Sequence, residues 1–429
     1  MKFLSTSGAP EKVSFREAVM RGLAPDNGLY YPESIPQLSK DWIERLPEHS
    51  LTDIGYEVMR HFTNEDLDEE KLREIIGETL NFPIPLVPLS DNLYTLELFH
   101  GPTLAFKDVG ARFLARCLGT FAETGKQITV LVATSGDTGS AVGRGFFNVP
   151  GVDVKILYPS GKVSKLQEQQ LTTLGNNIEA YEINGSFDDC QRMVKEAFLD
   201  KELQQELTLT SANSINIARW LPQSIYYFWA IGQLPSRENV VISVPSGNYG
   251  NLAGGLLAKA MGLPVAKFIA SSNSNDIFPA FLRSGSFDPR PSVKTISNAM
   301  DVGNPSNHPR IIEIYQALFD EITKDIAGYS CSDEQTKLTI KSVLEKYHYL
   351  TDPHGAVGYY GLEKYCEKHE AGQSIFLETA HPAKFHETIQ EITGMDINIP
   401  ERLRVALDLE KRSTQLKPTL VALKEKLMP

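Results

Sequence analysis

Short apolar runs alternate with amphipathic segments over most of this chain. Each run is rich in β-branched residues, and a turn and a helical apolar spacing follow it. The clearest strand predictions are QITVLVA (127–133), VDVKILYPS (152–160), NIEAYEIN (177–184), VVISVPS (240–246) and QSIFLET (373–379). This alternation predicts an α/β protein in which helices cover both faces of a mostly parallel sheet.

The two ends of the chain depart from this alternation. Residues before 82 have a charged helical pattern, as in NEDLDEEKLREIIGETL (64–80), without a glycine-rich loop after a strand. The prolines of FPIPLVPLSDN (82–92) then predict a linker or an edge strand, because proline ends helices and is excluded from central strands. We therefore place a boundary near residue 85, after a mainly helical N-terminal segment. The tail 400–429 is charged and helical in pattern.

Composition narrows the class of protein and of partner. The 429 residues are 41% hydrophobic and 22% charged, as in a globular protein of two or three domains. Lysine and arginine number 42 against 54 acidic residues, and the net charge of -12 disfavours binding to nucleic acid or to an anionic membrane. No run is long enough to span a membrane, and residues 1–14 lack the apolar core of a secretory signal, so we expect a cytoplasmic protein. The four cysteines and nine histidines show neither disulfide nor ligand spacing, so no metal is predicted.

Lys107 is the first candidate for chemistry. It lies in HGPTLAFKD (100–108), directly before an amphipathic helix and beside Phe106. A lysine that is partly removed from water has a lowered pKa, as an amine that forms a Schiff base requires. The alternative is a structural lysine that extends its amine to solvent from a helix start.

A glycine-containing turn is the second candidate. VPSGNYGN (244–251) lies between a predicted strand and a predicted helix. Gly247 and Gly250 can bring backbone N–H groups close to a ligand, and the helix N-terminus favours an anion, so the turn suits a phosphate. Ser246 and Asn248 would add side-chain contacts. The turn matches neither nucleotide-binding glycine motif, and a plain tight turn remains the alternative.

Two further turns carry polar clusters. ATSGDTGSA (133–141) offers hydroxyl and N–H donors for a carboxylate, although Asp137 and Thr138 are also typical helix caps. SANSINIAR (211–219) combines amides and hydroxyls with Arg219, which would form a second anion site. An ordinary capping cluster is the alternative there.

Taken together, five motifs resemble the threonine synthases, pyridoxal-phosphate enzymes of the tryptophan synthase β-subunit fold type. These motifs are HGPTLAFKD, ATSGDTG, SANSIN, VPSGNYGN and ETAHPAKF, in this order. The resemblance covers nearly the whole chain, since STSGAPEKVSFREAVMRGLAPDNGLYYP (5–32) is similar to the N-terminal segment of the family. It implies two open, mostly parallel α/β lobes after the helical segment. The implied division is 1–85 for that segment, 86–125 with 211–429 for the large cofactor-binding lobe, and 126–210 for the small lobe.

The resemblance also implies a set of site residues. Lys107 would be the catalytic, Schiff-base lysine, and Thr379 would contact the pyridine nitrogen of pyridoxal 5'-phosphate. The implied contacts of the cofactor phosphate are Ser246, Gly247, Asn248, Tyr249, Gly250 and Asn251. The implied substrate contacts are Ser135 and Thr138 for the carboxylate, with Asn213, Ser214 and Arg219 for the substrate phosphate. The chain departs from the family pattern at Tyr249, where phenylalanine is frequent, and at Asn251, where aspartate is frequent.

The implied activity is the last step of threonine biosynthesis. O-phospho-L-homoserine and water would give L-threonine and phosphate by γ-elimination and β-addition. The implied partner is this small molecule, with no nucleic acid or membrane, and the enzyme would be a monomer or a homodimer. Two alternatives stay open: a related lyase, either a dehydratase or a phospholyase, and a non-catalytic α/β ligand-binding protein. The second anion site separates this activity from a dehydratase, which has no leaving phosphate to hold.

Overall fold

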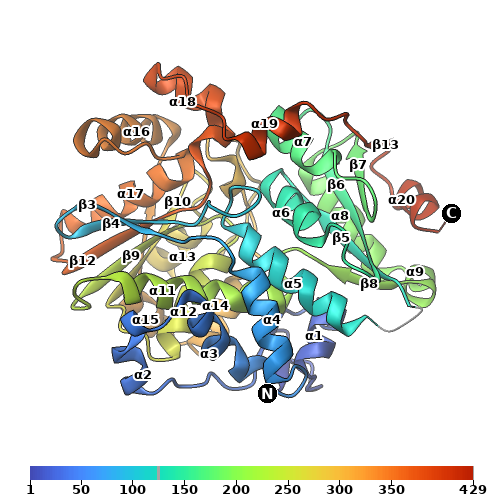
Figure 1. Ribbon diagram of the computed structural model, residues 1–429, viewed down its shortest axis with the longest axis horizontal. Coiled ribbons are helices and arrows are strands. Elements are labelled where there is room, and N and C mark those ends of the chain that lie inside the picture. The colour runs from blue at the N-terminus through green and yellow to red at the C-terminus, as the bar shows by residue number, and fades with distance from the viewer. Residues whose placement is uncertain (123–125, 429) are drawn as a thin grey trace.

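Two mostly parallel sheets organise the chain, as the computed structural model shows for residues 1–122 and 126–428 (Figure 1). The larger sheet has the order β11-β10-β9-β12-β4-β3, and only β3 is antiparallel to its neighbour. Its strands are β3 (Leu86–Ser90), β4 (Leu93–Glu97), β9 (Val240–Pro245), β10 (Lys267–Ser272), β11 (Ile326–Ser330) and β12 (Gln373–Glu378). All residues of β9 and β12 are buried, because helices cover both faces of this sheet.

Ten helices of the described chain pack on or beside the larger sheet, and an eleventh, Glu401–Leu407, packs against the helix Lys165–Thr172 of the small lobe. They are α5 (Lys107–Phe121), α10 (Ile217–Trp220), α11 (Ile225–Gln233), α12 (Gly250–Ala260), α13 (Ile277–Ser284), α14 (His308–Ile314), α15 (Phe319–Asp325), α16 (Asp333–Tyr347), α17 (Pro353–Cys366), α18 (His386–Thr393) and α19 (Glu401–Leu407). Short 3-10 turns at Leu221–Ser224, Asn298–Met300 and Pro382–Phe385 connect some of them. Helix α5 lies between the two lobes (Figure 1).

The smaller sheet is parallel throughout, with the order β13-β7-β6-β5-β8. Its strands are β5 (Ile128–Ala133), β6 (Val152–Pro159), β7 (Ile178–Ile183), β8 (Thr208–Ser211) and β13 (Thr414–Leu416). Its helices are α6 (Asp137–Phe146), α7 (Lys165–Thr172), α8 (Phe187–Leu199), α9 (Lys201–Glu206) and α20 (Leu420–Leu427). The predicted α/β class with two mostly parallel lobes is thus confirmed.

The C-terminal tail corrects one predicted boundary. The sequence division placed all of 211–429 in the large lobe, yet β13 pairs in parallel with β7 at the edge of the smaller sheet. Leu416, Leu423 and Leu427 are buried in the core of that lobe, and β13 and α20 lie beside the small lobe in Figure 1. Burial of these apolar side chains against the core of the small lobe explains why the tail returns there.

The N-terminal segment is not purely helical. It contains α1 (Phe15–Arg21), α2 (Lys40–Glu44), α3 (Leu51–Thr63), α4 (Glu69–Thr79), a 3-10 turn at Leu46–Glu48 and a two-stranded antiparallel sheet of β1 (Phe3–Ser5) and β2 (Tyr30–Pro32). The ring of Phe15 lies 6.4 Å from that of Phe113 and 6.2 Å from that of Phe121 in α5. The segment therefore shares its core with the large lobe. Within the described ranges, no helix is both long and apolar enough to cross a membrane.

Candidate active site

Lys107 begins helix α5 at the carboxyl end of the larger sheet. The N–H of Phe106 donates to the carbonyl oxygen of Thr379 at 2.9 Å, and Ala105 forms an isolated bridge with Ala380. These backbone contacts tie the segment before Lys107 to the end of strand β12. As a result, Lys107 and Thr379, which lie far apart in the sequence, line the same cavity.

The surroundings of Lys107 favour its neutral amine. Burial lowers the pKa of Lys107 to about 8; the charge of Asp137 opposes this shift, and those of Arg219 and Lys384 add to it. Its Nζ lies 5.8 Å from the centre of the Phe106 ring and forms no hydrogen bond within the described ranges. A pKa of about 8 leaves part of the amine population neutral near physiological pH, and this neutral form can act as nucleophile or base.

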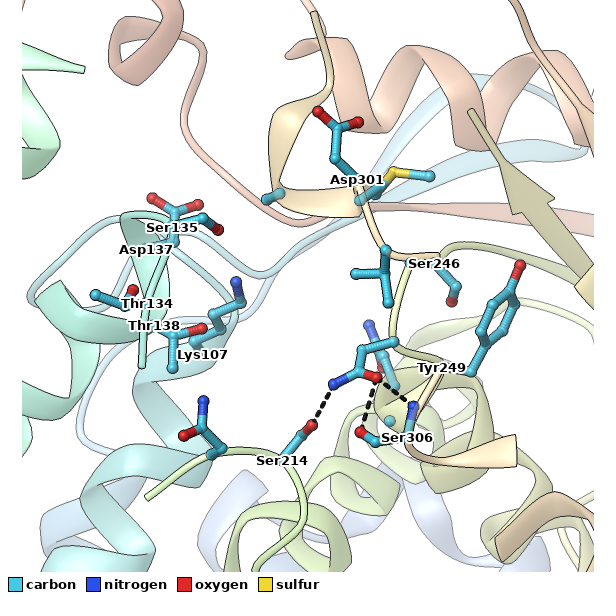
Figure 2. A pocket seen from close by; sticks show the side chains of 18 of the residues that line it. Lys107, Thr134, Ser135, Asp137, Thr138, Ser214, Ser246, Tyr249, Asp301 and Ser306 are labelled. Atoms are coloured by element: carbon cyan, nitrogen blue, oxygen red, sulfur yellow. Dashed lines mark hydrogen bonds between the residues drawn. The ribbon is translucent and has the colours of Figure 1, made fainter. Parts of the chain in front are cut away.

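The glycine-containing turn joins β9 to α12 on the other side of the cavity (Figure 2). A β-carbon at Gly247 would lie 2.6 Å from Cα of Met300, so only glycine fits there without a shift of backbone. No side chain caps the N-terminus of α12. The buried Oγ of Ser246 and Nδ2 of Asn251 have no hydrogen-bond partner in the described parts of the chain. Unused donors at a helix N-terminus fit the phosphate of pyridoxal phosphate.

Tyr249 contributes backbone rather than side chain to this turn. Its φ of 57° is left-handed, and its ring lies 4.6 Å from that of Phe278. Its hydroxyl is hydrogen-bonded to Ser272, away from the cavity (Figure 2). The residue that differs from the commonest family pattern therefore leaves the backbone N–H groups of the turn in place.

Asn248 connects the turn to two other segments. Its Nδ2 donates to Oγ of Ser214 at 2.8 Å, and its Oδ1 accepts from the N–H of Ser306 at 2.6 Å (Figure 2). Ser214, which the resemblance assigns to the substrate phosphate, thus lies beside the glycine turn. The two predicted anion sites share a border at this residue.

The small lobe supplies the loop between β5 and α6. Oγ1 of Thr134 accepts hydrogen bonds from the N–H groups of Gly136 and Gly139, so this hydroxyl holds the loop together. Ser135 and Thr138 line the cavity across from the glycine turn (Figure 2). Within the described ranges, neither hydroxyl forms a hydrogen bond. Both can therefore donate to a bound carboxylate.

Asp137, the first residue of helix α6, forms a buried ion pair with Lys384. Its Oδ1 lies 2.6 Å from Nζ of Lys384, and both side chains are buried. Gln167 donates to the same oxygen at 2.9 Å, and Nζ of Lys384 also donates to the carbonyl of Thr103 at 3.0 Å. Burial alone would raise the pKa of Asp137, but the charges of Lys384 and Lys107 hold it well below its ordinary value. This ion pair joins the two lobes beside Lys107.

Arg219 and Asn213 also line the cavity. Nη1 of Arg219 donates to the carbonyl of Ala212 at 2.7 Å, whereas its buried Nε has no partner among the residues described. Burial lowers the pKa of Arg219 to about 10, so it is cationic at neutral pH. Nδ2 of Asn213 donates to the carbonyl of Ala133 at 2.9 Å. The unpartnered Nε of the Arg219 guanidinium is therefore a charged donor that could bind an anion.

One cavity of about 370 Å³ brings every predicted site residue together. They are Lys107, Ser135, Thr138, Asn213, Ser214, Arg219, Ser246, Gly247, Asn248, Tyr249, Gly250, Asn251 and Thr379. The segment 290–306 and His354 also line this cavity, although the sequence motifs did not predict them. Nδ1 of His354 is 2.5 Å from Oδ1 of Asp352, and its Nε2 accepts from the N–H of Ala299. Neither has a local sequence signal, because segment 290–306 is irregular and His354 lies within a helix.

The fold and this cavity define a pyridoxal-phosphate-dependent enzyme. The family model described as "Pyridoxal-phosphate dependent enzyme" matches residues 78–378. Models described as "Threonine synthase N terminus" and "Threonine synthase, C-terminal" match residues 2–80 and 355–426.

Full-length relatives specify the family further. A threonine synthase of Haemophilus influenzae is 48% identical over 92% of this chain and 91% of its own length. The crystal structure of threonine synthase from Escherichia coli has a TM-score of 0.93 at 42% identity and covers 100% of this chain and 99% of that one. A PLP-bound threonine synthase from Brucella melitensis has a TM-score of 0.92 at 35% identity, with 100% and 98% covered. The chain belongs to the threonine synthase family.

Proposed function

We propose that this enzyme converts O-phospho-L-homoserine and water to L-threonine and phosphate. The observation that carries the proposal is the shared cavity, in which an amine with a pKa of about 8 lies with two groups of anion donors. One group surrounds the glycine turn, and the other includes the partly unsatisfied Arg219. A substrate with both a carboxylate and a phosphate, bound next to a phosphorylated cofactor, requires such a set of donors.

Pyridoxal phosphate fits the residues present. Lys107 would bond to it, the turn from Ser246 to Asn251 would hold its phosphate, and Thr379 would face its ring nitrogen. A neutral hydroxyl at that position does not hold a proton on the nitrogen. When bound, the cofactor supplies the electron sink that stabilises negative charge on the substrate carbons.

The side chains of this protein orient the substrate and move its protons. Ser135 and Thr138 would hold the carboxylate, and the amine of Lys107 would remove the Cα proton. A Cβ proton is then lost, the Cγ–O bond breaks as phosphate departs, and Cγ gains a proton. The hydroxyl of water finally bonds to Cβ, the remaining proton of water goes to the released phosphate, and the amine of Lys107 would return a proton to Cα. Asn213, Ser214 and Arg219 would anchor the phosphate and stabilise it as it leaves.

A product assay tests the reaction. Purified enzyme given O-phospho-L-homoserine should release phosphate and threonine in equal amounts. Release of phosphate with 2-oxobutanoate would instead identify a phospholyase, and binding without turnover would identify a ligand-binding protein. Lys107→Ala should abolish product formation, whereas Lys162→Ala, at an exposed lysine outside the cavity, should not. Borohydride reduction followed by mass analysis should locate the cofactor on Lys107.

Arg219 has a separate test. Arg219→Ala should lower kcat and raise KM for the phosphorylated substrate, because the same charge anchors the phosphate and stabilises its departure. Arg219→Lys retains the charge and should recover part of the activity. Normal kcat and normal KM in the alanine variant would contradict the assignment.

We also propose the setting of the enzyme. Its negative net charge of -12 supports a small-molecule partner without nucleic acid or an anionic membrane, in the cytoplasm. We place it as a monomer or a homodimer. The proposed domains are 1–85, 86–125 with 211 to about 412, and 126–210 completed by β13 and α20.

A further inference from the structure

A fully buried arginine lies behind the glycine turn. Arg310, in helix α14, is 0% exposed. Its Nε donates to the carbonyl of Tyr30 at 3.1 Å, and its Nη1 donates to the carbonyl of Ser214 at 2.9 Å and to Oδ1 of Asn307 at 2.8 Å. Its Nη2 donates to the carbonyl of Ile215 at 2.6 Å. All of these acceptors are neutral.

Among the described residues, the charge of Arg310 has no counter-ion. Over the residues that the structure describes, no carboxylate lies within 4.0 Å of its guanidinium, which stacks 4.6 Å from the ring centre of Trp220. Burial lowers the pKa of Arg310 to about 9, so it remains protonated at neutral pH. A buried charge without a partner is costly, which indicates that an anion belongs nearby.

The hydrogen bonds around Ser214 have fixed directions. Because Oδ1 of Asn307 accepts from Arg310, its Nδ2 must be the atom that donates to Oγ of Ser214, at 3.2 Å. Because Oδ1 of Asn248 accepts from the N–H of Ser306, its Nδ2 donates to the same Oγ, at 2.8 Å. Both lone pairs of the Ser214 hydroxyl are therefore used, and its proton must go to an acceptor outside this network.

The free proton of Ser214 lies at the anion-binding end of α12. A β-carbon built on Gly250, the first residue of that helix, would be 3.6 Å from Cβ of Ser214. The unpartnered, buried Oγ of Ser246 and Nδ2 of Asn251 line the same cavity. Three side-chain donors and the helix N-terminus thus converge where Arg310 adds an uncompensated positive charge.

We infer that Arg310 is a positioning residue for the phosphate of the cofactor: through Asn307 it commits the Ser214 hydroxyl to donate to that phosphate, and its buried charge attracts the dianion. This inference rests on the proposed function for the identity of the anion. It moves Ser214 from the substrate phosphate, where the resemblance placed it, to the cofactor phosphate. No lysine or arginine would then need to touch the cofactor phosphate directly.

Cofactor binding with and without the phosphate tests this inference. Full-length protein freed of cofactor is titrated with pyridoxal phosphate and with pyridoxal, and the ratio of the two Kd values is compared among variants. Ser214→Ala should weaken pyridoxal phosphate roughly 10- to 100-fold, as expected for one hydrogen bond to a charged group, and should leave pyridoxal unchanged. Arg310→Met should weaken it at least as much, and Arg310→Lys by less.

A matched control separates the site from general effects. Arg237 also donates to backbone carbonyls, those of Ile43 and Glu44, but lies outside the cavity. Arg237→Met should leave the Kd ratio unchanged. Ser214→Ala removes one hydroxyl and leaves every charge in place. It therefore tests the inference even if Arg310→Met does not fold.

Two results would overturn the inference. In the first, Ser214→Ala and Arg310→Lys weaken the binding of pyridoxal and of pyridoxal phosphate by the same factor, or change neither Kd value. In the second, the Kd for pyridoxal phosphate is unchanged and the KM for the phosphorylated substrate rises instead. Ser214 would then contact the substrate phosphate, as the resemblance implied. Because the titration measures binding alone, it stays informative even if the product assay shows a different reaction.

Discussion

Replacing Lys384 with methionine should destabilise the protein by about 3–5 kcal/mol, the cost of breaking a buried ion pair from one side. Lys384 is 0% and Asp137 is 4% exposed in the side chain, with 2.6 Å between Nζ and Oδ1. Methionine fills much of the same space, so the variant removes mainly the charge. Asp137 would stay buried without its ion-pair partner, stabilised by the hydrogen bond from Gln167 and the charge of Lys107.

The free energy of unfolding from urea melts measures this effect. Lys337→Met is the matched control, because Lys337 lies 3.5 Å from Glu391 with side chains 43% and 73% exposed. A solvated pair of this kind contributes little, so the control should melt like the wild-type protein. A loss of less than about 1 kcal/mol in Lys384→Met would refute the reasoning, since it would fall well short of the cost of an unpaired buried charge.

A double variant separates charge from packing. Asp137→Asn in the Lys384→Met background removes the uncompensated carboxylate, so it should recover part of the lost stability. If the double variant instead loses the sum of the two single losses, the residues do not act as a pair.

Three further predictions follow from packing and from the pKa of Lys107. Gly247→Ala should lower the cofactor content, measured by visible absorbance, because the added methyl group would lie 2.6 Å from Cα of Met300. Gly77→Ala is the control: the space around Gly77 is open, so this variant should keep the full cofactor content. The rate at which cofactor-free enzyme takes up pyridoxal phosphate should rise with pH through about 8, since only the neutral amine of Lys107 attacks; a rate that rises only near pH 10 would contradict the burial of this amine. Leu423→Ala should cost about 2–5 kcal/mol in urea melts, whereas Val421→Ala, 68% exposed on the same helix, should have little effect; equal losses would show that α20 is not anchored through its buried face.

Local signals explain how much of the site the sequence could predict. Three parts of the site lie at the start of a helix whose apolar spacing is evident in the sequence: the glycine turn, the loop at Ser135, and Lys107. The carboxyl ends of parallel strands meet at one edge of a sheet, so the motifs could be expected to converge. The structure places them in one cavity.

Long-range partners explain what the sequence could not predict. Lys384 lies in the motif ETAHPAKF, but its ion pair with Asp137 depends on how the two lobes pack against each other. Arg310 follows an ordinary helical pattern, and nothing local shows that its donors reach Tyr30 and Ser214. Strand β13 has three residues, too few for an alternating pattern to be evident.

The late position of β13 in the chain bears on how the protein folds during synthesis. Strands β5 to β8 leave the ribosome long before Leu416, so the edge of β7 waits without its neighbour while the whole second half of the large lobe is made. An unpaired strand edge is a template for association with other chains. In the nascent small lobe, the edge of β7 therefore stays open to association with other chains until β13 has been made.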